Sequence, residues 1–283
     1  MYVMISLLTL VVALTFNVCF GSRLQSHYQL LGMTVSELVF LLCFLGGACA
    51  LILFARKHPL ERDETLDLYE ISSLRPAKLR HLAGGLLLIA GGYLGTTLYF
   101  HILALLFPEA IQAASDSMLV VLYSENLPLM LLGTALIPAI CEELLFRGLI
   151  HYSFTRQASA RYAVIATALL FAGFHLSPIR FPSTFASGLL LGYALHRSGS
   201  ILVPMLMHLA SNAVSALVSF HAPPVMLDGT AGVILLGTGT LLLLGLGCAL
   251  LEEHPRAALS RHPVTVLATV GIILLLTVLP IVL

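Results

Sequence analysis

Three groups of polar residues lie inside long apolar stretches of this 283-residue chain, at spacings that place their members on shared helix faces. An ionisable side chain at the middle of a membrane costs about 2.5–3.5 kcal/mol, so such residues are kept mainly where they have a function. We therefore take as candidate catalytic residues Glu142, Glu143, Arg147, His175, His208 and Asn212.

The first group separates two neighbouring carboxylates. Each residue of an α-helix advances by about 100°, so Glu143 and Arg147, four residues apart, share a face and can form an ion pair. Glu142 is rotated by about 100° from Glu143 and is poorly placed for Arg147. The spacing predicts a free Glu142 suited to general acid or base chemistry, supported by the Glu143–Arg147 pair. The alternative is a structural ion pair with a spare glutamate that reaches towards water.

His175 ends the next apolar stretch, and its predicted depth matches that of Glu142. If the chain turns near residues 157–160, both residues lie about 16 residues, or about 24 Å, from the turn. The match predicts a carboxylate and an imidazole that face each other across two antiparallel helices.

His208 and Asn212 share a helix face, and each can donate a hydrogen bond to an anion, as an oxyanion site requires. The alternative is a polar clamp between packed helices, which is common in membranes. Counted from the short turn at residues 196–200, His208 is only about 12 Å deep. The prediction therefore requires that this turn is sunk into the membrane or that the helices are tilted.

The elements that carry these groups are membrane helices. Hydrophobic residues make up 59% of the chain and charged residues 10%, and the mean hydropathy is +0.99. Soluble proteins carry about 25% charged residues, so this chain cannot cover a water-facing surface. We predict an all-α fold, a polytopic transmembrane bundle of eight or nine helices, as one domain over residues 1–283. The segments long enough, or nearly so, to cross a bilayer are 2–20, 34–55, 82–106, 126–155, 161–177, 182–196, 200–220, 230–251 and 263–283.

The distribution of Lys and Arg sets the expected orientation. Most of them fall in connections that alternation places on one side, above all 56–81, and this side is expected to be cytoplasmic together with the N-terminus. We expect 56–81 to be a solvated connector with an interfacial helix, and 107–125 to be an outer loop. The compact, low-charge chain favours a bacterial inner membrane. The lipid bilayer is the expected partner, and a net charge of zero argues against nucleic acid.

Together the motifs Glu142-Glu143-x-x-x-Arg147, Phe171-x-x-x-His175 and His208-x-x-x-Asn212 resemble the CAAX protease and bacteriocin-processing family of intramembrane endopeptidases, which includes the Ras-converting enzymes. The resemblance covers about residues 126–220, which would be the catalytic core. It implies that Glu142 and His175 activate water for attack on a peptide carbonyl, and that His208 and Asn212 stabilise the oxyanion. By the same resemblance Glu143 and Arg147 hold the site together, no metal or cofactor is needed, and the substrate is a membrane-anchored protein or peptide.

Other functions remain open from the sequence. A zinc metalloprotease would have an adequate ligand set in Glu142, His175 and His208, but the HExxH arrangement is absent. A non-proteolytic scaffold or immunity-type protein would use the same fold to bind a partner, although it need not keep a buried charge. Cys141 invites a cysteine-protease interpretation, but a thiol among apolar residues is a poor nucleophile. A transporter would be expected to show paired interrupted helices in two repeated halves, which are not evident.

Overall fold

The computed structural model describes residues 1–16, 18, 19, 29–57, 66–112, 127–221 and 229–252, which form helices and connections without a strand among them. This confirms the all-α prediction. The predicted span 263–283 and most of the predicted outer loop lie outside the described residues. The elements used below are α1 (Tyr2–Phe16), α3 (Gln29–Lys57), α4 (Leu68–Ser72), α5 (Leu79–Leu106), α7 (Leu127–Leu131), α8 (Ile137–Glu143), α9 (His151–Thr155), α10 (Ala160–Phe174), α11 (Phe181–Ser198), α12 (Leu202–His221) and α13 (Gly229–Leu251).

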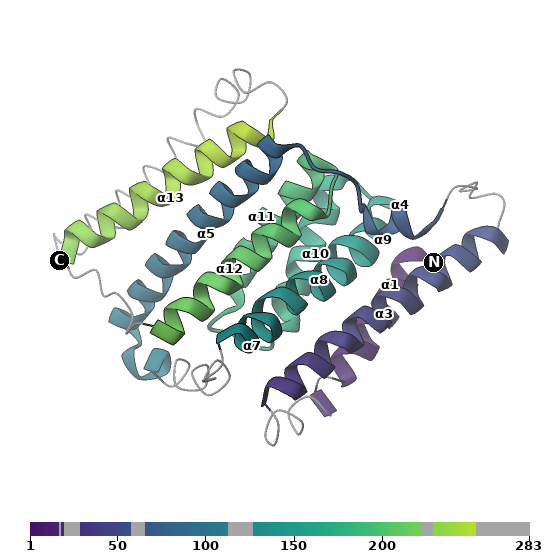
Figure 1. The fold of residues 1–283 in the computed structure, drawn as a ribbon, viewed down its shortest axis with the longest axis horizontal. Coiled ribbons are helices and arrows are strands. Elements are labelled where there is room, and N and C mark those ends of the chain that lie inside the picture. Colours follow the sequence, from purple (N-terminus) through teal and green to yellow (C-terminus); the bar gives the residue numbers. More distant parts are fainter. Residues whose placement is uncertain (17, 20–28, 58–65, 113–126, 222–228, 253–283) are drawn as a thin grey trace.

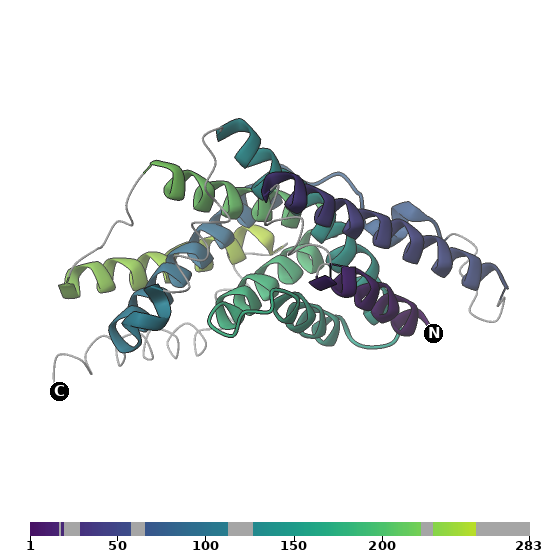
Figure 2. The same cartoon turned by 90° about the horizontal axis from the view of Figure 1, so that it is seen from below.

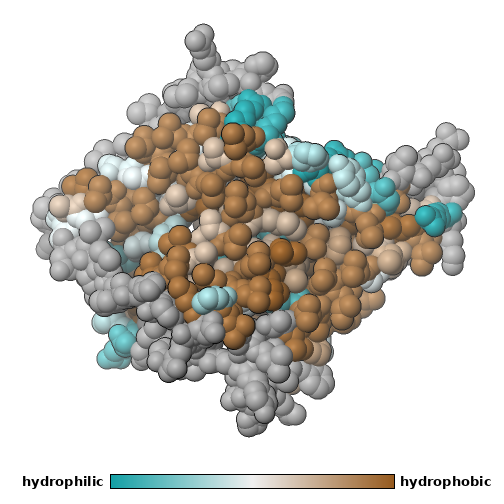
Figure 3. Space-filling view, in the orientation of Figure 1, coloured by the Kyte–Doolittle hydropathy of each residue, from teal (hydrophilic) through white to brown (hydrophobic). Residues whose placement is uncertain are grey.

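Several of these helices match a bilayer in length and composition. Four described helical stretches are long and apolar enough to cross it, namely Glu37–Arg56, Leu79–Leu106, Leu127–Thr155 and Gly229–Leu251. The helices α1, α10 and α12 are apolar but shorter. Large leucines such as Leu53 and Leu242 are exposed on the outside, and hydrophobic residues cover the broad middle of the face drawn in Figure 3. Exposed apolar surface on this scale identifies an integral membrane protein.

The helices form two layers. One layer contains α13, α5, α12, α8 and α3 in that order across the molecule (Figure 1). The second layer contains α11 and α10, which pack together behind α12 and α8, and α1, which packs against α3 (Figures 1 and 2). The predicted core helices therefore lie at the centre of the bundle, where α8, α10 and α12 can bring their polar residues together.

The contact between α5 and α13 depends on glycine. A Cβ atom added at Gly247 would lie 2.7 Å from the backbone nitrogen of Leu88 and 2.8 Å from the carbonyl oxygen of Gly84. These distances are too short for any side chain, so the two backbones approach as closely as small residues permit in membrane helices.

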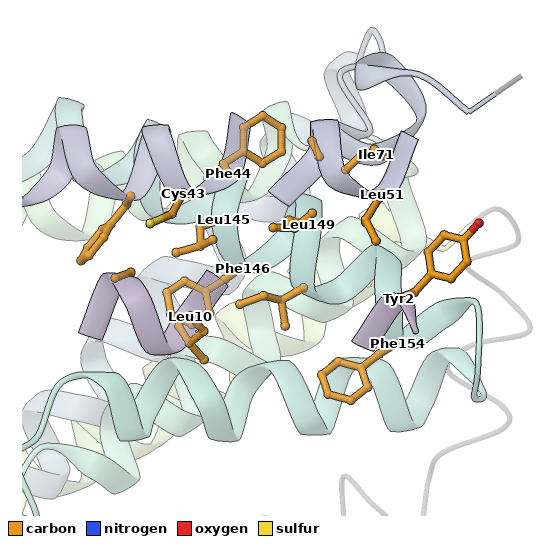
Figure 4. Packing of buried hydrophobic residues seen from close by; sticks show 14 of the residues in the cluster. Tyr2, Leu10, Cys43, Phe44, Leu51, Ile71, Leu145, Phe146, Leu149 and Phe154 are labelled. Atoms are coloured by element: carbon orange, nitrogen blue, oxygen red, sulfur yellow. The ribbon is translucent and has the colours of Figure 1, made fainter. Parts of the chain in front are cut away.

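A tightly packed hydrophobic core lies between α1, α3, α4 and the helix that follows α8 (Figure 4). Leu145, Phe146 and Leu149 are fully buried in it, together with Ile71 of α4. The segment 56–81, predicted to be a solvated connector with an interfacial helix, contains the short helix α4, and Ile71 on this helix is part of the core.

Residues 73–75 cover the turn that precedes α12. Gly199 ends α11 with a φ of 65°, in the left-handed region that glycine adopts readily. The Ile201 amide then donates to the Ser73 carbonyl at 3.0 Å, and the Ser200 hydroxyl donates to the Arg75 carbonyl. Ser200 and Ile201 are fully buried. The turn thus lies inside the end of the bundle, which accounts for the apparent depth mismatch of His208.

The connections predicted to share a basic side do meet at one end of the molecule. Arg197 forms an ion pair with Glu252, and Arg80 donates to the Glu252 carbonyl at 3.4 Å. Arg156 lies over the ring of Tyr2, at 5.9 Å from its centroid, so the N-terminus is at the same end. The charge asymmetry used for the orientation is therefore a property of the folded protein.

Candidate active site

The helix that carries Glu142 and Glu143 is locally irregular on both sides of α8. Two π-helical segments, η3 (Leu132–Leu136) and η4 (Leu144–Ile150), flank it. Such segments are rare and are frequently found at functional sites. Pro138 has no N–H to donate to the carbonyl of Thr134 four residues earlier. That carbonyl accepts a hydrogen bond from Nδ2 of Asn212 at 3.1 Å, which ties α12 to the irregular helix.

Glu143 is the centre of a closed polar cluster. Its Oε1 accepts from Nη1 of Arg147 at 2.9 Å and contacts Nδ1 of His208 at 2.8 Å. The side chains of Glu143 and Arg147 are 0% exposed. Arg147 Nη2 also donates to the Gly188 carbonyl of α11 at 3.4 Å. The structure thus contains the ion pair that the spacing predicts. His208 also contacts Glu143, whereas the spacing in the sequence had paired His208 only with Asn212.

Phe171 links this cluster to both histidines. The guanidinium carbon of Arg147 is 4.2 Å from the Phe171 ring centroid, a cation–π contact. The same ring meets the imidazoles of His175 and His208 edge-on, at centroid distances of 4.9 and 5.9 Å. The phenylalanine of the Phe171-x-x-x-His175 motif therefore positions side chains from three helices.

His175 lies where α10 ends, and its ring orientation is fixed by the backbone. Its Nδ1 is 2.8 Å from the carbonyl oxygen of Phe171. A carbonyl can only accept, so Nδ1 carries the proton and a neutral imidazole leaves its Nε2 lone pair free. Leu176 follows with a φ of 49°, a left-handed conformation that stops the helix.

A cavity of about 600 Å³, called the polar cavity below, opens beside this cluster. Four of the six predicted residues line it, namely Glu142, His175, His208 and Asn212. Oε2 of Glu142 has no hydrogen-bond partner among the described residues and is 4.0 Å from Nε2 of His208. Glu143 and Arg147 lie behind the cavity wall. The structure therefore brings all six residues into one region and divides them between an open cavity and a closed cluster.

The remaining wall of the polar cavity is mostly apolar but also carries one guanidinium group and several hydroxyl groups. Arg180, in the connection between α10 and α11, contributes a half-buried guanidinium group. Hydroxyl groups come from Tyr93, Thr96, Thr134, Ser177, Ser183, Thr184, Ser187, Ser211 and Ser215. Such a wall can satisfy the backbone polar groups of an extended peptide, which lipid cannot do.

Glu37 of α3 also lines the polar cavity, and sequence reasoning missed it. Its Oε2 is buried and, among the described residues, has no hydrogen-bond partner. A signal was available, because Glu37 is an ionisable residue inside the predicted span 34–55. Cys141, by contrast, is buried and is not part of the cavity lining.

The described residues include no group of three or more His, Cys, Asp or Glu side chains arranged to hold a metal ion. Within the site, Oε1 of Glu143 is paired with Arg147 and His208.

Fold and site together define an all-α integral membrane protein with a polar cavity inside its helix bundle. A family model described as type II CAAX prenyl endopeptidase, Rce1-like, matches residues 124–214, which contain all three motifs. This segment of the chain is therefore similar to the CAAX protease family, as the motifs predicted, and that family is one of peptide hydrolases. Neither the curated proteins nor the solved structures gave a significant match.

Proposed function

We propose that the protein is an intramembrane endopeptidase that hydrolyses a peptide bond of a membrane-anchored protein or peptide. The observation that carries this proposal is the contrast between the two adjacent glutamates. Glu143 is neutralised through its Oε1 by Arg147 and His208 and lies behind the cavity wall, whereas Glu142 lines the polar cavity and its Oε2 accepts no hydrogen bond from the described residues. An unpaired carboxylate beside an imidazole is the arrangement that general-base chemistry requires.

Glu142 and His175 activate the water molecule. The Nε2 lone pair of His175 can accept a hydrogen bond from water, because Nδ1 is committed to the Phe171 carbonyl. Glu142 takes the proton of that water while its oxygen bonds to the peptide carbonyl carbon. Both side chains line the same cavity, in which the water would be bound between them.

His208 and Asn212 stabilise the oxyanion that forms. The Glu143 carboxylate at Nδ1 of His208 favours the imidazolium form, in which Nε2 also carries a proton and can donate. Asn212 gives one amide hydrogen to the Thr134 carbonyl, and its second hydrogen is left for the oxyanion. Preorganised donors of this kind contribute about 10²–10³-fold each in other enzymes.

The substrate reaches the cavity from the membrane or from a membrane surface. We propose that the basic end of the bundle and the N-terminus are cytoplasmic and that the protein resides in a bacterial inner membrane. The family description names a prenyl endopeptidase, so a peptide with a prenylated C-terminal tail is the first substrate to test.

The test is cleavage of membrane-anchored peptides, prenylated and unprenylated, by the purified full chain in lipid vesicles. Glu142→Gln should reduce cleavage by about 10²-fold or more, because the base is lost while the shape is kept. Glu109→Gln removes an exposed carboxylate outside the cavity and serves as the matched control. Undiminished cleavage by Glu142→Gln would refute the assignment.

Two further measurements separate the alternatives. Stoichiometric metal in the purified protein, with activity abolished by chelation, would favour a metalloprotease. A cellular phenotype that is fully complemented by Glu142→Ala would favour a scaffold or immunity-type protein, since neither needs the base.

A further inference from the structure

Glu37 is a second unpaired carboxylate in the polar cavity. It lies on α3, which packs against α8, and it faces the same cavity as Glu142. Its Oε2 is buried without a hydrogen-bond partner, and Oε2 of Glu142 is in the same condition, among the residues that the structure describes. Two buried carboxylates that lack donors therefore line one small space.

Three side chains of the site can carry a positive charge, namely Arg147, His208 and Arg180, and Arg180 lines the polar cavity itself. Arg147 is paired with Glu143, and His208 contacts Glu143 through Nδ1 and faces Glu142 through Nε2. No ion pair in the described part of the chain includes Glu37, and the cavity that it lines is also lined by Glu142. Two like charges in a low-dielectric site cannot both ionise readily, so a single shared proton is the less costly state.

We propose that Glu37 and Glu142 share one proton and that Glu37 delivers it to the leaving amine of the substrate. This inference rests on the proposed function, since it supplies the general acid of that reaction. It also explains why a helix outside the family-matched segment carries a carboxylate into the cavity.

The proton balance of the reaction closes with this pair. Glu142, as the carboxylate, takes one proton from water while the water oxygen bonds to the peptide carbonyl carbon. The intermediate then collapses, the carbon–nitrogen bond breaks, and the nitrogen takes the proton of the Glu37 carboxylic acid. Glu142 now holds the shared proton and Glu37 is ionised. Transfer of that proton back through cavity water restores the starting state, after one water has been consumed and one acid and one amine released.

The pair predicts a bell-shaped pH dependence of kcat. At low pH Glu142 becomes protonated and the base is lost, and at high pH the shared proton is lost and the acid is missing. The other titratable or charged groups that line this cavity, from α5, α10, the α10–α11 connection and α12, are Tyr93, His175, Arg180 and His208, and the buried thiol of Cys141 on α8 lies outside the lining.

The experiment compares Glu37→Gln, Glu37→Asp and the exposed control Glu109→Gln in lipid vesicles, with a membrane-anchored peptide that the wild type cleaves. Glu37→Gln keeps the shape but cannot act as the acid, so kcat should fall about 10²-fold with KM within about threefold. The alkaline limb of the pH profile should disappear in this variant. Glu37→Asp keeps a carboxylic acid and should restore part of kcat.

A readout independent of cleavage is the infrared carbonyl band of a protonated carboxylic acid. The wild type should show such a band at neutral pH, and Glu37→Gln should abolish it. The inference is overturned if Glu37→Gln keeps the wild-type pH profile and the wild-type kcat. It is also overturned if Glu37→Gln changes only KM, and only for substrates with a basic residue near the scissile bond. Absence of cleavage by the wild type removes the proposed function instead, and the infrared result then decides on the shared proton alone.

Discussion

The two faces of α8 differ in their surroundings. On one face Glu143 and Arg147 form a fully buried ion pair, which His208 joins from the cavity wall, and the three side chains make up the closed cluster. On the other face Glu142 meets Glu37 and His175 around a cavity of about 600 Å³ with hydroxyl-rich walls. Glu142 and Glu143 are consecutive residues, so the difference arises only from the rotation of about 100° between them.

The closed cluster positions the side chains at the polar cavity. Below, the closed face of α8 is the one that carries Glu143, and the open face is the one that carries Glu142. The closed cluster connects η4, α11 and α12, and Phe171 of α10 packs on both Arg147 and His208. These contacts fix the imidazoles before a substrate arrives, as preorganised catalysis requires. Mutations on the closed face should therefore affect stability first, and mutations on the open face should affect activity first.

The largest effect is expected on the closed face. Arg147→Met leaves the Glu143 carboxylate buried without its guanidinium partner, which should destabilise the protein by about 3–5 kcal/mol. Unfolding in detergent micelles measures this loss. The double variant Glu143→Leu with Arg147→Met removes both charges and should recover a large part of the stability. If the double variant is less stable than Arg147→Met, the contact between Glu143 and Arg147 does not stabilise the protein as an ion pair.

Asn212→Ala tests the open face. It removes an oxyanion donor and should lower kcat by about 10²–10³-fold. The lost hydrogen bond to Thr134 should cost only about 0.6 kcal/mol of stability, an average value for such bonds in membranes. A loss of stability in proportion to activity would instead support a structural clamp between α12 and η3.

Phe171→Leu tests the link between the two faces. The variant loses the cation–π contact to Arg147, worth about 2 kcal/mol when desolvated, together with the edge-on contacts to both histidines. Stability and kcat should both fall. An effect on only one of them would mean that the closed cluster does not orient the histidines.

The smallest effect is expected at a hydroxyl of the cavity wall. Ser183 lines the cavity, but its hydroxyl donates to the Arg180 carbonyl of its own chain segment at 2.9 Å. Ser183→Ala should change stability by less than about 0.5 kcal/mol. Cleavage close to the wild-type rate would set the baseline against which the other cavity variants are judged.

Relations within a helix were predictable from sequence, and relations between helices mostly were not. The i,i+4 spacing sufficed for the Glu143–Arg147 pair, and counting from a hairpin turn sufficed to place Glu142 and His175 at one cavity. The contact of His208 with Glu143 depends on how α12 is rotated against α8, which periodicity does not specify. Glu37 lies about a hundred residues before the motifs, so only the packing of α3 on α8 reveals its place. The fold class and the family followed from hydropathy and motifs, whereas the roles of the six residues stay predictions.

The most direct test of the account is a side-by-side comparison of Glu142→Gln and Glu143→Gln in the same vesicles, with cleavage measured per folded molecule. Glu142→Gln should unfold at the wild-type temperature and cleave about 10²-fold or more slowly. Glu143→Gln should lose stability because Arg147 is left without its counter-charge, and its folded fraction should retain more cleavage than Glu142→Gln. The reverse result is a stable but inactive Glu143→Gln beside an active Glu142→Gln. It would contradict the central claim that the face of α8 with Glu143 stabilises the site and the face with Glu142 carries out the reaction.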